Sequence, residues 1–128
     1  MASKIELAWA AGLWEGEGCF TNHKARNPTR KDGYTNCIIY PCASITMTDK
    51  DVLDRFVRII GFGKVNGPYF DKRGKRKPKY QWGVVSKEAY KLIEMFRPFM
   101  LSRRLAKIEE VLSNCCRYST NDPSERKR

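Results

Sequence analysis

The sequence lacks the features of membrane, secreted and disulfide-stapled proteins. It has no apolar run near the ~18 residues of a membrane span, and residues 1–14 carry no basic start or cleavage site of a secretion signal. It has only one histidine, and its five cysteines stand at 19, 37, 42, 115 and 116, a spacing that suits neither a disulfide framework nor a zinc site. We therefore expect free thiols, no membrane segment and an intracellular location, in the cytoplasm, the nucleoid or an organelle.

Acidic residues are scarce relative to basic ones. The chain has 25 Lys+Arg against 14 Asp+Glu, which gives a formal net charge of +11. Such an excess indicates a polyanionic partner, either nucleic acid or an anionic membrane surface. A membrane-surface protein would normally have a basic amphipathic helix, and the basic clusters here lie in expected strands and loops. Nucleic acid is therefore the favoured partner.

The residues that are present support one folded domain. The chain has 128 residues, of which 41% are hydrophobic and 12% aromatic, enough for one core and too few for two. We expect a single domain over residues 1–117. Residues 118–128 have little apolar content, so we expect them to form a polar, disordered tail.

Local patterns predict an α+β chain. Ser3 and Glu6 have the spacing of a capping box, so a helix should begin just after Ser3, and Gly16 and Gly18 should end it in a tight turn. Its stripe of Ile5, Ala8, Trp9, Gly12 and Leu13 has helical spacing. The later elements are expected as strands at 19–24, 36–47, 64–70 and 80–85, and as helices at 49–60, 86–96 (capped by Ser86) and from 102 onward. This order suits a mostly antiparallel sheet with helices on one face and the other face open.

Residues 9–18, WAAGLWEGEG, are the most informative stretch. They place two carboxylates, Glu15 and Glu17, at the C-terminal end of the first helix, where the helix dipole already concentrates negative charge. A bound cation would offset that repulsion, which suggests metal ligands. Solvated surface acids in a turn are an equal alternative from spacing alone.

This stretch resembles the signature of the LAGLIDADG homing endonucleases, with Gly12, Leu13 and Gly18 in place. Ala10 stands where the signature has Leu, and both acids are Glu where Asp is usual. The segments ITMTDKD at 45–51, GFG at 61–63 and RPF at 97–99 also fall where a family member would have them, so the resemblance covers about residues 5–113. It implies the αββαββα fold, with an antiparallel saddle-shaped sheet over the DNA major groove.

The resemblance also implies roles for the motif acids. The final acid of the family motif holds a divalent metal, a role that falls on Glu17, with the backbone carbonyl of Gly16 assisting. Mg²⁺ or Mn²⁺ would be the cofactor, since a longer carboxylate arm still supplies hard oxygen ligands. Glu15 is expected to support helix ends rather than to bind metal.

Three further residues match catalytic positions of the family. Asp49 falls near a polar active-site position, with a helix-capping role as the equal alternative. Arg103 and Arg104 stand where the family often has a lysine close to the scissile phosphate. Arginine stabilises phosphate charge but is a poor proton donor, so a proton-transfer role at these positions is in doubt.

A single motif copy predicts a dimer. One Glu17 cannot hold a metal centre that bridges the attacking and leaving oxygens, so two first helices should meet at a two-fold axis. Ala8, Ala11 and Gly12 are the small residues expected at that interface. The target should then be nearly palindromic double-stranded DNA.

DNA contacts are expected from the open face of the sheet and its loops, although each candidate could equally be a solvated surface residue. The turn at residues 71–79 is the firmest element, because six basic residues and one acid give it a net charge of +5, suited to phosphate contacts. The candidates are Thr21, His23, Lys24, Arg26, Arg30, Lys31, Tyr34, Asn36, Ile38, Tyr40, Cys42, Ser44, Thr46, Lys64, Asn66, Lys72, Arg73, Lys75, Arg76, Lys77, Lys79 and Gln81.

The sequence therefore predicts a site-specific, Mg²⁺-dependent DNA endonuclease that makes double-strand breaks and is associated with intron or intein mobility. A non-catalytic nucleic-acid binder, such as an RNA maturase that assists intron splicing, is the alternative. An intact Glu17 favours the enzyme, because a binder has no need of it.

Overall fold

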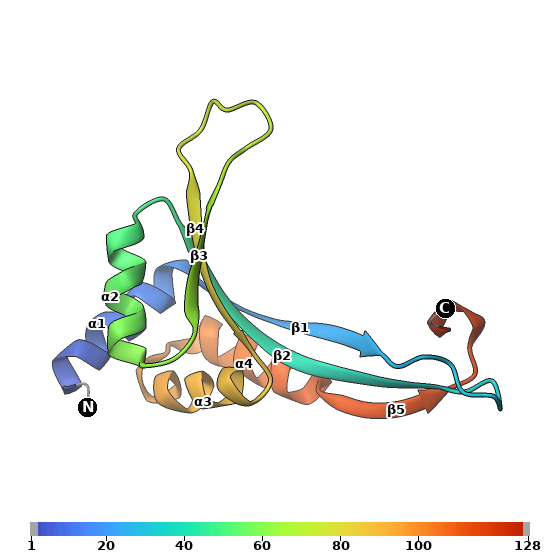
Figure 1. Cartoon of the computed structure of the whole chain (residues 1–128). Coiled ribbons are helices and arrows are strands. Elements are labelled where there is room, and N and C mark those ends of the chain that lie inside the picture. The colour runs from blue at the N-terminus through green and yellow to red at the C-terminus, as the bar shows by residue number, and fades with distance from the viewer. Residues whose placement is uncertain (1–2, 127–128) are drawn as a thin grey trace.

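The structure, a computed structural model, describes residues 3–126, so residues 1–2 of the expected domain and 127–128 of the expected tail lie outside it. The chain has the predicted order of helix, two strand-strand-helix units and a closing helix, followed by a fifth strand (Figure 1). The elements are α1 (Lys4–Glu17), β1 (Gly18–Arg26), β2 (Thr35–Met47), α2 (Lys50–Ile60), β3 (Lys64–Tyr69), β4 (Lys79–Val85), α3 (Lys87–Phe96), η1 (Arg97–Phe99), α4 (Ser102–Asn114), β5 (Cys116–Thr120) and η2 (Pro123–Glu125).

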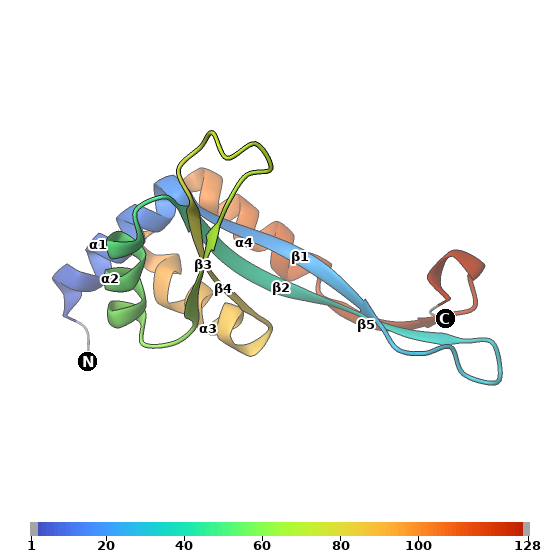
Figure 2. The same cartoon turned by 45° about the horizontal axis from the view of Figure 1, so that its top comes forward.

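The sheet is antiparallel and is built around β2. One edge of β2 pairs with β1 over residues 37–45, and the other edge pairs with β4 over residues 42–47 and with β5 over residues 35–39. The order along the main path is β1-β2-β4-β3. Figures 1 and 2 show the β3–β4 hairpin rising from the middle of the long β1–β2 ribbon, with β5 alongside the far end of β2.

The core lies between the sheet and the helices and is mainly aromatic. Trp14 is fully buried at its centre, with ring centroids 5.1 Å from Phe20, 5.8 Å from Phe56 and 6.0 Å from Trp82. Because successive strand residues alternate between faces, Phe20 and Trp82 fix the helix-covered face. The opposite face carries Thr21 and Gln81 and has no helix packed on it (Figure 2).

The first helix begins as predicted but ends differently. Ser3 Oγ accepts a hydrogen bond from the Glu6 N–H at 3.1 Å, and Glu6 Oε1 accepts one from the Ser3 N–H at 3.3 Å, which confirms the capping box. At the other end Gly18 has extended backbone, with φ −76°, so α1 runs directly into β1 without the expected tight turn. Ser86, expected to cap α3, makes no side-chain cap hydrogen bond.

The side of α1 that enters the core was also wrongly predicted. Ala10, Ala11 and Trp14 are the buried residues of the helix, whereas Ala8 and Gly12 are exposed. Ala11 is only 2% exposed and therefore belongs to the core of its own chain, not to a free helix face. Small and apolar residues occur on every side of α1, so periodicity alone could not identify the inner face.

The predicted disordered tail is the clearest difference between expectation and structure. Residues 116–120 form β5 on the otherwise unpaired edge of β2, and η2 follows. Glu125 then bonds back to the β1 strand, with Oε1 2.6 Å from Lys24 Nζ and Oε2 2.6 Å from Arg26 Nε. Backbone pairing and ion pairs order this segment, and neither depends on the apolar content used for the prediction.

Candidate active site and nucleic-acid interface

The C-terminal end of α1 opens into a hollow that contains two carboxylates. Glu17 is the last residue of the helix and is exposed, and Asp49 lies at the start of α2. The hollow has a volume of about 410 Å³ and is lined by Glu17, Thr46, Met47, Thr48, Asp49 and Lys79. The fold therefore brings together Glu17, Asp49 and a lysine from β4 that are far apart in sequence.

Asp49 starts α2 through its backbone alone. Its carbonyl accepts a hydrogen bond from the Val52 N–H at 3.2 Å, but its side chain makes no cap hydrogen bond. The carboxylate is exposed at the hollow. The capping alternative therefore finds no support, and the carboxylate is available to a ligand.

Glu15 supports the ends of two helices, as expected. Its Oε2 accepts a hydrogen bond from the Leu101 N–H at the start of α4, at 3.4 Å, and its carbonyl accepts one from Arg104 Nε at 3.1 Å. Arg104 is thus tied to the end of α1, and its guanidinium is half-buried. Arg103, its neighbour, is exposed and forms no ion pair within residues 3–126.

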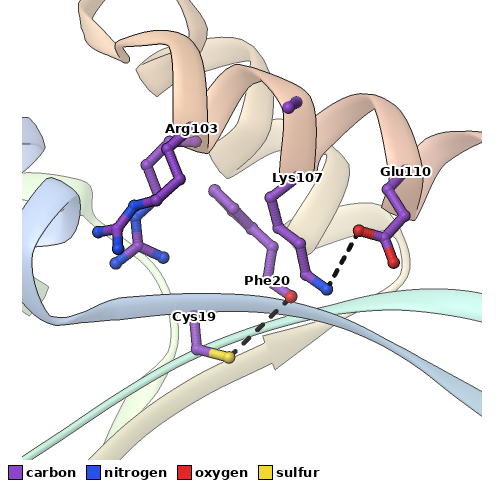
Figure 3. Close-up of a pocket in the computed structure, with 7 residues that line it drawn as sticks. Cys19, Phe20, Arg103, Lys107 and Glu110 are labelled. Carbon is purple, nitrogen blue, oxygen red and sulfur yellow. Dashed lines mark hydrogen bonds and ion pairs between the residues drawn. The ribbon is translucent and has the colours of Figure 1, made fainter.

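A second hollow, of about 400 Å³, lies between α4 and the start of β1 (Figure 3). Arg103 and Lys107 extend into it from α4, and Cys19 borders it from β1. Lys107 Nζ lies 3.4 Å from Glu110 Oε2. The sequence analysis missed Lys107 because it considered only the start of the helix, although the four-residue spacing from Arg103 places the two side chains on one helix face.

The donors for a metal ion are few in a single chain. Within residues 3–126, no group of three or more His, Cys, Asp or Glu side chains is placed to hold a metal. Glu17 and Asp49 do supply the hard carboxylate oxygens that Mg²⁺ and Mn²⁺ prefer. The residues present therefore fit such an ion in type, and a complete site needs ligands from outside this chain.

Most of the predicted DNA contacts lie on the open face of the sheet or at its loops. The residues placed on the open face by strand register are Thr21, His23, Asn36, Ile38, Tyr40, Ser44, Thr46, Lys64, Asn66, Lys79 and Gln81. The exposed loop residues are Arg30, Lys31 and Tyr34 at one tip and Lys72, Arg73, Lys75, Arg76 and Lys77 at the other. The two tips lie at separate ends of the sheet (Figure 1).

Three predicted contacts do not fit this surface. Cys42 shares the open-face register but is only 7% exposed, because β1 and β4 flank it on both sides. Lys24 and Arg26 alternate with the open-face residues and therefore belong to the opposite face, where both are paired with Glu125. The sequence showed their charge but not the carboxylate that folds back onto them.

Comparison with known proteins decides the family. The family described as LAGLIDADG endonuclease matches residues 10–113 of the sequence. The chain belongs to the LAGLIDADG endonuclease family. No curated protein matches the chain at the level of sequence.

Solved LAGLIDADG structures share the fold. The homing endonuclease I-TnaI is 22% identical, with a TM-score of 0.63 over 88% of this chain and 71% of that one. The intron-encoded homing endonuclease I-CeuI, solved with DNA, is 14% identical, with a TM-score of 0.61 over 88% of this chain and 53% of that one. The LAGLIDADG homing endonuclease I-GzeII, solved with its DNA target, is 18% identical, with a TM-score of 0.62 over 84% and 34%. The present chain thus spans between about one third and about seven tenths of these proteins.

Membership of the LAGLIDADG family gives the site its context. The two hollows flank the junction where α1 ends at Glu17 and β1 begins, and α1 carries the family motif. Acidic groups line one hollow, while Arg103 and Lys107 give the other a basic side. Across residues 3–126, no helix has the length and apolar character needed to cross a membrane.

Proposed function

We propose that this LAGLIDADG chain is a site-specific, divalent-metal-dependent DNA endonuclease that acts as a homodimer on a long, nearly palindromic target. The observation that carries the proposal is the shared hollow of Glu17 and Asp49 at the end of the motif helix, beside Lys79. Acidic ligands next to basic groups suit hydrolysis of a phosphodiester, in which cations and positive side chains offset the charge on phosphate. Mobility of an intron or intein is the biological role that this activity would serve.

The exposed side of α1 supports dimerisation. Ala8, Gly12 and Gly16 recur at every fourth position and are all exposed, and an added Cβ at Gly12 or Gly16 would meet no atom within 4 Å. Small residues at this spacing allow the backbones of two helices to approach closely. Two α1 helices packed along this stripe would bring both Glu17 carboxylates near the two-fold axis. Ala11, buried in its own core, leaves the interface expected from the sequence, and Gly16 joins it.

Each side chain then has a defined role. Glu17, the Gly16 carbonyl and Asp49 would hold the metal, and bound Mg²⁺ or Mn²⁺ would supply the Lewis-acid stabilisation of the reacting oxygens. Arg103 and Lys107 would hold the scissile phosphate from the other side of the junction. Arg104 acts as a positioning residue, because its bond to the Glu15 carbonyl holds the end of α1 against α4.

The test compares cleavage and binding of the same DNA. Duplexes that the wild-type protein cuts with Mg²⁺ are selected from a randomised pool and then offered to Glu17→Gln, Asp49→Asn and the control Glu88→Gln. The control makes the same charge change on the exposed side of α3. We expect Glu17→Gln to bind these duplexes and to cut them at least about 100-fold more slowly, with Glu88→Gln unchanged.

Two outcomes would count against the proposal. Equal cleavage by wild type and Glu17→Gln would place the active site elsewhere. Tight binding of structured RNA with no cleavage of any selected duplex would favour the maturase alternative.

A further inference from the structure

The fifth strand extends the open face of the sheet beyond the αββαββα unit. In the antiparallel register Arg117 lies opposite Ile38, and Ser119 lies opposite Asn36. Residues directly opposite each other in an antiparallel pair point to the same face. Ser119 Oγ also donates a hydrogen bond to Asn36 Oδ1 at 2.6 Å, which shows that these two side chains meet. Arg117 and Ser119 therefore lie on the open face, with Ile38 and Asn36.

The charges at this end of the sheet are divided between its two faces. Lys24 and Arg26, on the helix-covered face, are both paired with Glu125. Arg117 is exposed on the open face, and within residues 3–126 its side chain makes no ion pair or hydrogen bond. The C-terminal segment thus neutralises the basic groups of one face and adds a free guanidinium to the other.

The surface around Arg117 is shaped to receive a ligand. A hollow of about 520 Å³ is lined by Asn27, Asn36, Cys37, Ile38, Arg117, Tyr118 and Ser119. Its polar atoms include two amides, a hydroxyl and the guanidinium, which are the groups that read base edges and phosphates in DNA. The side chains of Asn36 and Arg117 come from different strands and are held side by side by the β2–β5 pairing.

We propose that β5 is an added DNA-reading strand, in which Arg117, together with Asn36 held by Ser119, contacts the outer base pairs of each half-site. This inference rests on the proposed function only in requiring that duplex DNA binds the open face. Asn36 lies nine residues along β2 from Ile45, the partner of the first β1 residue, Gly18. At about 3.3 Å per residue the separation is roughly 30 Å, or roughly nine base pairs from the cleavage position at about 3.4 Å per step.

The experiment uses the full chain with Arg117→Ala, Arg117→Lys, Ser119→Ala and the control Arg58→Ala. Arg58 is an exposed arginine in the last turn of α2, away from the open face, so its removal makes the same charge change. Two readouts are taken without metal. The first is the salt dependence of binding to one 40-bp duplex (a length chosen at roughly 20 bp per half-site) by fluorescence anisotropy, and the second is the base preference selected from a randomised duplex pool.

We expect Arg117→Ala to lower the magnitude of the salt slope by about 1, the value for one lost phosphate or base contact, with Arg58→Ala unchanged. Arg117→Ala and Arg117→Lys should both lose base preference at the outer positions and keep it near the centre, since lysine cannot reproduce a bidentate arginine contact. Ser119→Ala should weaken the preference at the same outer positions.

An unchanged selected sequence together with an unchanged salt slope for Arg117→Ala would overturn the inference. Should Arg117→Ala alter the circular dichroism spectrum, Ser119→Ala and Arg117→Lys decide in its place, and unaltered outer preferences in both would again overturn it. Selected duplexes that bind but are never cut with Mg²⁺ would remove the endonuclease proposal and leave the reading role of β5 supported. Failure of the wild-type chain to bind any duplex would remove both.

Discussion

Trp14 lies directly over the backbone of Gly18. An ideal Cβ built at Gly18 would be 2.2 Å from Cδ2 of the Trp14 ring, far inside contact distance. The Gly18 backbone is extended, so the glycine is needed here for space and not for an unusual φ. This contact lets α1 turn into β1 while Trp14 stays in the core, and it sets where Glu17, the residue between them, leaves the helix.

Gly18→Ala should therefore destabilise the protein by about 3 kcal/mol, because the added methyl would force the buried indole to move. Urea unfolding followed by tryptophan fluorescence measures this change. Gly16→Ala is the matched control, since a Cβ there meets no atom within 4 Å and alanine favours the helix. A loss of stability for Gly18→Ala no larger than that for Gly16→Ala would contradict the close contact.

Gly12→Leu tests the dimer. The residue is exposed, and nothing lies within 4 Å of its Cβ position, so the subunit should fold normally. A leucine would hold two α1 helices apart, and sedimentation equilibrium should show a monomer where the wild type is a dimer. Tyr90→Leu, at an exposed position on α3, is the control for an added surface leucine and should remain dimeric. A dimeric Gly12→Leu protein would exclude the proposed interface.

Glu125 should make the C-terminal segment sensitive to acid. Hydrogen bonds from Lys24 and then Arg26 lower the pKa of the Glu125 carboxyl below its ordinary value of 4.5. A lowered pKa contributes stability that is present above the ordinary value and is lost as the pH falls through the lowered one. The wild type should therefore lose its advantage in melting temperature over Glu125→Gln as the pH falls below 4.5.

Removing the partners provides the control for that measurement. In a background of Lys24→Gln and Arg26→Gln, the difference in melting temperature between chains with and without the Glu125→Gln change should no longer vary with pH in this range. A wild-type advantage that stays constant from neutral pH to pH values well below the ordinary range of a carboxyl group would show that the ion pairs do not stabilise the segment.

The basic turn of residues 71–79 should position DNA without reading its sequence. Lys75 and Arg76 are exposed at the tip of the β3–β4 hairpin, and Asp71 orders the turn by accepting a hydrogen bond from the Lys75 N–H at 3.2 Å. Replacing both basic residues by alanine should lower the magnitude of the salt slope by about 2 and leave the selected sequence unchanged. The double alanine variant of Arg58 and Lys87, two exposed basic residues on helices, is the control. A changed sequence preference would instead mean that the turn contacts bases.

Much of the molecule was predictable because its signals are local. The Ser3–Glu6 capping box, the left-handed Gly61 after α2 and the alternation of Tyr80, Trp82 and Val84 each depend on a few neighbouring residues. The order of elements follows from such signals, and the motif at 10–18 adds Glu17 as the candidate metal ligand. These predictions required no knowledge of which segments meet in space.

Only the tertiary structure decided what depends on contacts between distant segments. It placed Asp49 and Lys79 in the hollow of Glu17, moved Ala11 into the core, and paired Lys24 and Arg26 with Glu125. It also made a strand of residues 116–120, because the open edge of β2 supplies backbone partners that no property of the segment itself reveals. Sequence thus determined the elements and the motif, whereas the pairing of distant charges and strand edges determined which side chains remain free to act.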